Sequence, residues 1–245
     1  MNETRRGRIW TQIGRRSLGT PVTVAHVCAA AVPGVGVDGA GVTVMVSTTV
    51  RDTVHATDRV AGELEEWQLT FGQGPCVDAF AEDGPVLIID LDAPIHLARW
   101  PVFTPAALRS GARAVFALPL QVGAIRLGVL DLYRARPGPL SDDQLADALA
   151  FADAAGMLLL EGAGGEPPDS AELAWQRDDP TSHHAEVHQA TGMILAQLGI
   201  SAEAAFARLR AYAYANDRRL GNVAADVVGR RLRFDDNRGE EGERS

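Results

Sequence analysis

The stretch His188–Val228 reads HQATGMILAQLGISAEAAFARLRAYAYANDRRLGNVAADVV and decides the fold of the C-terminal part of the chain. Its apolar residues recur at helical spacing in three runs, which are separated by Gly199 and by Asn216 with Asp217. With Thr181 or Ser182 capping the first helix and Ser201 the second, we predict three short amphipathic helices around one core. The apolar positions of the first helix are Val187, Ala190, Thr191, Ile194, Leu195 and Leu198, and the third is expected to continue to Leu232.

The segment LEGAGGEPPD, Leu160 to Asp169, holds three glycines and two prolines between two helical patterns. This composition is typical of a linker, so we predict two domains. The expected organisation is a basic arm (1–20), a first domain (21–162), a linker (163–180), a helical module (181–234) and an acidic, disordered tail (235–245).

Upstream of the linker, the apolar pattern changes to that of strands. Alternating β-branched runs over Gly41–Val50 and Gly84–Asp90, then over Ala114–Leu120 and Arg126–Tyr133, predict four strands. The last two form an antiparallel hairpin around Gly123. Helices are expected over Pro21–Ala31 and from Ser141, where Gln144 three residues later forms a capping box. The fold class is therefore α+β, with an antiparallel sheet flanked by helices followed by a small three-helix module.

Charge divides along the same boundaries. The 245 residues carry a net charge of −9 and contain no lysine; residues 20–162 sum to −9, whereas residues 181–234 sum to +3. This asymmetry suggests an acidic sensing body and a basic module that contacts an anion, although +3 is also ordinary for a surface. The apolar runs are too short for a membrane helix and the N-terminus has no signal-like apolar region, so we expect a cytoplasmic protein without a membrane partner.

The helical module resembles the ANTAR family of RNA-binding transcription antiterminators. The matching residues are Gln189, Ala190, Gly192, Met193, Ser201, Glu203, Ala204, Phe206, Leu209, Ala213, Asn216, Leu220, Val223 and Ala224. Thr191 replaces the basic residue common at its position, and Gly221 replaces a polar one. The resemblance implies binding to a pair of stem-loops in nascent transcripts, which prevents formation of a terminator hairpin. Two stem-loops imply two modules and hence a homodimer, for which Ser141–Glu161 and Ala171–Arg177 are the expected surfaces.

Side chains suited to RNA loops are present in this module. Guanidinium and aromatic planes can stack on unpaired bases, and amides can hydrogen-bond to base edges. The candidate RNA-binding residues are Arg218, Arg219, Asn216, Asn222, Arg208, Arg210, Tyr214, Gln189 and Thr191. Each also has a structural alternative: the arginines of the second helix could be solvated, Asn216 could cap a helix, and the tyrosines could belong to the core.

The first domain resembles the GAF family of small ligand-binding sensor domains, in the form common in actinobacterial regulators. The resemblance rests on FGQGPCVDAF (Phe71–Phe80), RWPVF (Arg99–Phe103) and GARAVFALPL followed by RLGVLDLY. It implies a pocket between the sheet and Phe71–Pro105 that holds an unidentified small molecule or only side chains. Cys76, Trp100 and Phe103 are the candidate pocket residues. The cyclic-nucleotide signature Asn-Lys-x-Phe-Asp-Glu is absent.

Catalytic, cofactor and metal sites are not expected. His55 and His96 are isolated, the two cysteines are too few for a cysteine-based zinc site, and no nucleophile-elbow or phosphate-loop motif occurs. Cys76 is interpreted as a buried thiol or as a thiol made reactive by its glycine-rich turn. Three functions therefore remain open: an RNA-dependent antiterminator with a small-molecule or redox sensor, a DNA-binding regulator, and a cysteine-dependent redox enzyme.

Overall fold

The computed structural model describes residues 3–45, 51–163, 184–216 and 218–234. The chain divides into two compact units, Met1–Asp178 and Asp179–Ser245, which are treated separately below. The Thr181 and Ser182 caps, most of the predicted linker with the Ala171–Arg177 surface, and the acidic tail lie outside the described residues.

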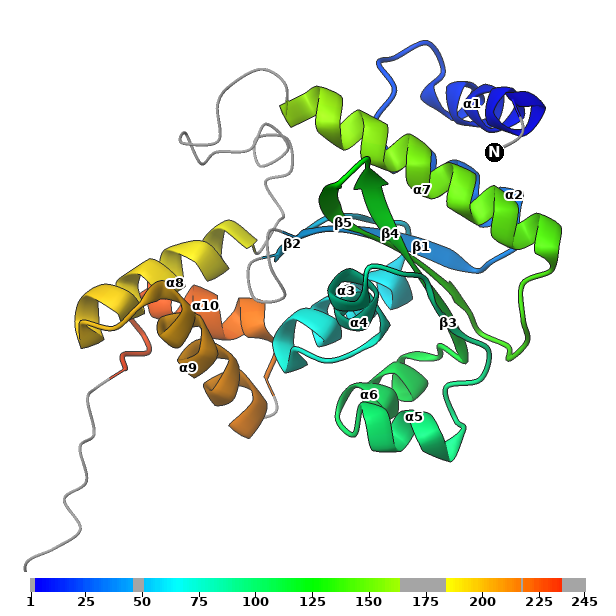
Figure 1. Cartoon of the computed structure of the whole chain (residues 1–245). Coiled ribbons are helices and arrows are strands. Elements are labelled where there is room, and N and C mark those ends of the chain that lie inside the picture. Colours follow the sequence, from blue (N-terminus) through cyan, green and yellow to red (C-terminus); the bar gives the residue numbers. More distant parts are fainter. Residues whose placement is uncertain (1–2, 46–50, 164–183, 217, 235–245) are drawn as a thin grey trace, which may run out of the picture. The chain divides into compact units, whose positions relative to one another are not determined.

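The first unit is built around one antiparallel sheet of five strands in the order β2-β1-β5-β4-β3 (Figure 1). The strands are β1 (Gly39–Met45), β2 (Arg51–Ala56), β3 (Val86–Ile88), β4 (Ala114–Val122) and β5 (Ile125–Arg134). Each neighbouring pair runs antiparallel, and β4 and β5 form the predicted hairpin with Gly123 at φ 61°. The α+β class and the antiparallel sheet are confirmed.

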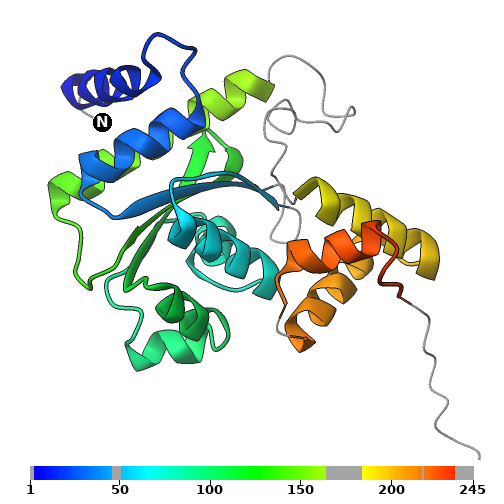
Figure 2. The same cartoon turned by 180° about the vertical axis from the view of Figure 1, so that it is seen from behind.

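Helices cover both faces of this sheet (Figures 1 and 2). They are α1 (Glu3–Ser17), α2 (Val24–Val35), α3 (Arg59–Phe71), α4 (Pro75–Glu82), α5 (Pro94–Arg99), α6 (Phe103–Ser110) and α7 (Asp142–Ala163). Alternate residues of a strand face opposite sides, so Phe116 and Leu118 pack under α2 and α7, whereas Val115 and Ala117 pack under α3 and α4. Helix α1 packs on the outer side of α2 and α7 (Figure 1). The sheet thus has a separate apolar core on each face.

The segment predicted as a basic arm is helix α1. Ile9 and Ile13, one turn apart, are completely buried, and the arginines on the same helix reach acidic residues of α7. Arg5 pairs with Asp143 at 2.7 Å, and Arg8 pairs with Asp147 at 2.6 Å. Much of the positive charge of this segment is therefore directed at the domain itself.

Helix α7 begins as its capping box predicts. The backbone N–H of Gln144 donates to Ser141 Oγ at 3.2 Å, and the Ser141 N–H donates to Gln144 Oε1 at 2.9 Å. Helix α2 extends past its predicted end at Ala31 and contains Pro33. Strand β2 and helices α3 to α6 were not predicted. The segments of β2, α4, α5 and α6 are short, whereas α3 carries Val60, Leu64, Trp67 and Phe71 at helical spacing, a signal that could have identified it.

The second unit consists of helices α8 (His184–Leu198), α9 (Ala202–Ala215) and α10 (Leu220–Val228), each in contact with the other two. Gly199 ends α8 with φ 62°, and Ser201 Oγ caps α9 by accepting the Ala204 N–H at 3.2 Å. The three predicted helices are confirmed. The shared core consists of Val187, Ala190, Ile194, Ala205, Leu209, Ala213, Leu220, Val223, Ala224 and Val227.

Two details of this unit were predicted wrongly. Leu195 is 37% exposed, because the buried face of α8 is narrower than its apolar stripe. Helix α10 ends at Val228 rather than Leu232, since Arg230 adopts φ 58° and the N–H groups of Arg231 and Leu232 both donate to the Asp226 carbonyl. The chain therefore reverses direction directly after α10.

No single helix in the described ranges is long and apolar enough to cross a membrane. Within the same ranges, the helix pair Glu186–Leu198 and Ala202–Ala215, bent by 109°, passes that test by length and composition alone.

Candidate RNA interface and buried polar cluster

The turn between α9 and α10 carries Arg218 and Arg219, two of the RNA-binding residues predicted from the sequence. Arg219 is the N-cap residue of α10 and is exposed, and its carbonyl accepts the Val223 N–H at 3.2 Å. Its side chain does not cap the helix. Helix α10 therefore starts without a side-chain cap from Arg219.

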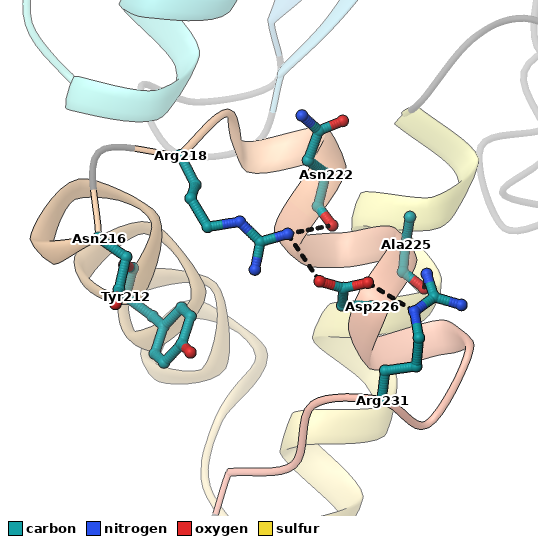
Figure 3. Close-up of polar contacts among 7 residues, drawn as sticks. All are labelled: Tyr212, Asn216, Arg218, Asn222, Ala225, Asp226 and Arg231. Atoms are coloured by element: carbon teal, nitrogen blue, oxygen red, sulfur yellow. Dashed lines mark hydrogen bonds and ion pairs between the residues drawn. The ribbon is translucent and has the colours of Figure 1, made fainter.

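Arg218 takes part in an ion-pair cluster that links the start and the end of α10 (Figure 3). Its Nη2 donates to Asp226 Oδ2 at 2.6 Å and lies 3.4 Å from the Asn222 carbonyl oxygen. Arg231, brought back by the reversal after α10, donates through Nε to Asp226 Oδ1 at 2.7 Å. One carboxylate thus holds two guanidinium groups, and the cluster has a net charge of +1.

Asp226 was not among the predicted site residues. It lies eight residues after Arg218 on the same side of α10, and both arginines lower the pKa of its carboxyl through hydrogen bonds. Its spacing within the third helical run is compatible with pairing to Arg218, but the approach of Arg231 depends on the chain reversal. The carboxylate fixes where two positive charges are displayed.

The remaining candidates differ in exposure and in the hydrogen bonds that their side chains make. Arg208, Tyr214 and Asn222 are exposed, as is Gln189 on α8. Asn216 donates through Nδ2 to the Tyr212 carbonyl at 2.8 Å and so acts as the predicted alternative, a helix cap (Figure 3). Thr191 donates its hydroxyl to the Val187 carbonyl at 2.7 Å.

Arg210 is half-buried, with its guanidinium carbon 5.7 Å from the centre of the Phe206 ring. Burial lowers the pKa of this arginine, but an arginine keeps its charge at neutral pH. Its aliphatic part therefore packs on the helix while its positive charge persists. Among the candidates, Arg219, Arg208, Tyr214, Asn222 and Gln189 are the more accessible ones.

In the first unit, polar side chains meet inside the core between the sheet and helices α3 and α4. Glu65 from α3 accepts the Thr43 hydroxyl of β1 at 2.7 Å, and Gln68 donates to Asp131 Oδ2 of β5 at 2.8 Å. Gln68 also accepts the Cys76 N–H at 2.7 Å, which places the first turn of α4 on this cluster. We call Glu65, Gln68, Cys76 and Asp131 the buried polar cluster.

Two glycines leave room for the buried polar cluster. A Cβ atom at Gly41 would lie 2.4 Å from Glu65 Oε1, and one at Gly74 would lie 2.7 Å from Gln68 Oε1. Gly74 also has φ 134°, a conformation that L side chains rarely adopt. The FGQGPC motif therefore lets the chain turn tightly enough to bring Cys76 against Gln68.

Burial dominates the ionisation of the cluster. It raises the pKa of Asp131 to about 6, although the Gln68 hydrogen bond opposes this shift. Burial and the charge of Asp131 raise the pKa of Glu65 and that of the Cys76 thiol. The reactive thiol considered from the sequence is therefore not favoured, because burial and the neighbouring carboxylates raise the pKa of the Cys76 thiol.

Arg51 supplies the positive charge beside these groups. It is 6% exposed, and its Nη2 donates to the carbonyl oxygens of Gln68 at 2.5 Å and of Leu69 at 3.1 Å. The recess bordered by Arg51, Glu65, Gln68 and Cys76 contains about 190 Å³ of space between atoms, and within the described residues none of it admits a water molecule. Side chains, rather than a preformed cavity, occupy this part of the domain.

Only Cys76 of the three predicted pocket residues borders this recess. Trp100 and Phe103 lie in the apolar core, 6.2 Å apart in an edge-to-face arrangement, and Trp100 Nε1 donates to Asp78 at 3.1 Å. Cys28 is buried on the opposite face of the sheet, where burial raises the pKa of its thiol to about 12. Both cysteines are reduced, and they belong to different cores.

Comparisons with known proteins agree with this division. A GAF domain model matches residues 20–159, and an ANTAR domain model matches residues 181–228; neither describes a catalytic family. A search of curated proteins found no match.

Among solved structures, the chain is similar to the GAF domain of a phosphoenolpyruvate-protein phosphotransferase from Coxiella burnetii. The identity is 14%, the match covers 67% of this chain and 98% of that chain, and the TM-score is 0.50. The GAF-B domain of DevS from Mycobacterium smegmatis is 22% identical over 55% of this chain and 88% of that chain, with a TM-score of 0.39. Free methionine-R-sulfoxide reductase from Neisseria meningitidis, in complex with its substrate, is 18% identical over 64% and 91%, with a TM-score of 0.41. The Coxiella structure supports the fold of the first unit.

Proposed function

Because the chain belongs to the GAF domain family and carries an ANTAR domain behind its GAF domain, we propose that it regulates transcription antitermination by binding stem-loops in nascent mRNA. ANTAR domains bind RNA and GAF domains sense small molecules, so the architecture is that of a regulator with a sensor. In this proposal, the sensor controls how the ANTAR domain is presented to RNA.

The observation that carries the proposal is the basic turn between α9 and α10. Arg219 is exposed there, and Asp226 fixes Arg218 and Arg231 beside it. RNA loops expose phosphates together with unstacked bases, which arginine can contact by charge and by stacking. The GAF domain is acidic and repels RNA, so contact is expected to be confined to the ANTAR domain.

A homodimer follows from the same proposal. Two stem-loops in one transcript would engage two ANTAR domains, one from each copy of the chain. Helix α7 offers partly exposed apolar residues for such a contact, Leu149 at 38% and Leu160 at 36%. Light-scattering mass with and without a two-hairpin RNA tests this; a strict monomer that binds the RNA tightly would exclude the dimer.

The function is tested by RNA binding and by transcription. We expect the full chain to bind a two-hairpin RNA more tightly than duplex DNA of equal length, and to increase read-through of a hairpin terminator in vitro. Equal or stronger binding to DNA would favour a DNA-binding regulator. Binding to neither nucleic acid, in dilute buffer, would refute the proposed RNA role.

A further inference from the structure

Three residues of the buried polar cluster carry groups that bind metal ions. An oxygen of Glu65, the sulfur of Cys76 and an oxygen of Asp131 all lie within 4.8 Å of one another. The three residues are 3%, 1% and 4% exposed. They come from α3, α4 and β5, so only the folded domain brings them together.

One oxygen in this group gives a second, independent indication of a ligand. Asp131 Oδ2 accepts the Gln68 amide, whereas in the described part of the chain the buried Oδ1 can accept only protons carried by the Glu65 carboxyl and the Cys76 thiol. Buried carboxylate oxygens are usually satisfied, because an unpaired one carries a desolvation cost. A cation bound between Asp131, Glu65 and Cys76 would satisfy it.

Charge in the site matches a divalent cation. A bound metal ion displaces the protons of its ligands, so the two carboxylates and the thiolate would carry −3, and the adjacent Arg51 guanidinium reduces this to −2. One divalent ion makes the buried site neutral, which a low-dielectric interior favours. A monovalent ion would leave a net charge in the core.

The donor set selects the class of metal. A thiolate with two carboxylates suits ions of intermediate softness such as Zn²⁺ and Fe²⁺, whereas Ca²⁺ and Mg²⁺ take oxygen ligands only. Ligands on one tetrahedral Zn²⁺ are roughly 3.4 to 3.6 Å apart at usual bond lengths. The observed limit of 4.8 Å therefore requires a contraction of about 1 Å, within reach of side-chain rotation. Met45 Sδ, 3.8 Å from the Cys76 sulfur, adds a soft neighbour.

We propose that Glu65, Cys76 and Asp131 form a binding site for one divalent transition-metal ion in the core of the GAF domain. The binding itself concerns the GAF domain alone. The use of metal occupancy as the sensed signal rests on the proposed RNA function.

The test uses untagged full-length protein freed of metal with a chelator, and Co²⁺ and Zn²⁺ as probes. We expect one Co²⁺ per chain, with the charge-transfer absorption of a cobalt–thiolate bond, and displacement of the cobalt by Zn²⁺. Histidines elsewhere in the chain would bind cobalt without that absorption. Absence of the thiolate band in folded wild-type protein overturns the proposal.

Matched variants identify the thiol and a carboxylate. Cys28→Ser, at the other buried thiol, should keep the band, and Cys76→Ser should lose it. Asp131→Asn should weaken uptake by at least about the tenfold that loss of an outer-shell partner already costs. Circular dichroism establishes that each variant is folded. A folded Asp131→Asn variant with unchanged cobalt uptake overturns the proposal. Loss of the thiolate band in folded Cys28→Ser also overturns it.

RNA binding is measured on the same preparations, with and without Zn²⁺. A protein that takes up cobalt as expected but binds no RNA in either state retains the metal site and refutes the proposed function. A protein that binds RNA but shows no thiolate band retains the proposed function and refutes the metal site. The two proposals therefore fail separately.

Discussion

Replacing Arg219 by alanine is the sharpest test of the RNA surface. The side chain is exposed and does not cap α10, and the backbone hydrogen bond from Val223 to the Arg219 carbonyl survives the change. Circular dichroism establishes that the helices persist in the variant, and a change in its RNA binding then reports the lost guanidinium.

The expected loss can be worked out from counterion release. One phosphate contact contributes about 0.7 to 0.9 to the slope of log K against log salt concentration. If the variant and the wild type bind RNA equally at 1 M salt, this slope corresponds to a loss of affinity of roughly 4-fold to 5.5-fold at 0.15 M salt, and of roughly 8-fold to 15-fold at 0.05 M. The effect must grow as salt is diluted.

Fluorescence anisotropy with a labelled two-hairpin RNA, over a series of salt concentrations, measures both quantities. Arg109→Ala is the matched control, because Arg109 is an exposed arginine on α6 of the acidic GAF domain and should not contact RNA. If Arg219→Ala leaves affinity and slope unchanged, or if Arg109→Ala lowers them equally, then the α9–α10 turn is not the RNA surface.

Three further predictions concern the GAF domain, each measured as the free energy of unfolding in chelator. Gly41→Ala places a methyl group against Glu65 and should destabilise the domain by about 1 to 3 kcal/mol. Gly62→Ala is the control, because the nearest atom is 3.8 Å away, and it should be neutral or stabilise α3 by up to about 1 kcal/mol. Equal effects of the two substitutions on the free energy of unfolding would contradict the packing argument. Because the pKa of Asp131 rises from 3.8 to about 6 on folding, the stability it contributes is present below pH 4 and is lost as the pH rises through 6, by on the order of 3 kcal/mol. Asp131→Asn should remove this difference, and an unchanged pH profile would argue against it. Ser141→Ala removes one bond of the capping box and should cost about 1 kcal/mol, whereas no change would mean that solvent replaces the cap.

Local patterns in the sequence were sufficient for the parts of the fold that depend on neighbouring residues. The period of apolar residues predicted α8, α9 and α10, and the caps at Ser141 and Ser201 followed from side chains close to the amides that they accept. The β4–β5 hairpin was equally accessible, since its two strands are joined directly at Gly123. The end of α10 was not, because it depends on a backbone reversal at Arg230.

What the amino-acid sequence determined by itself was the three C-terminal helices, the β4–β5 hairpin, the segregation of charge and the residue types available to RNA. Only the tertiary structure decided which of those side chains are engaged, as when Asp226 holds Arg218 and Arg231. It also decided that Glu65 and Cys76 meet Asp131, more than fifty residues further along the chain. Such contacts arise from the packing of α3 and α4 on β5, and periodicity along the chain carries no information about distances between separate elements.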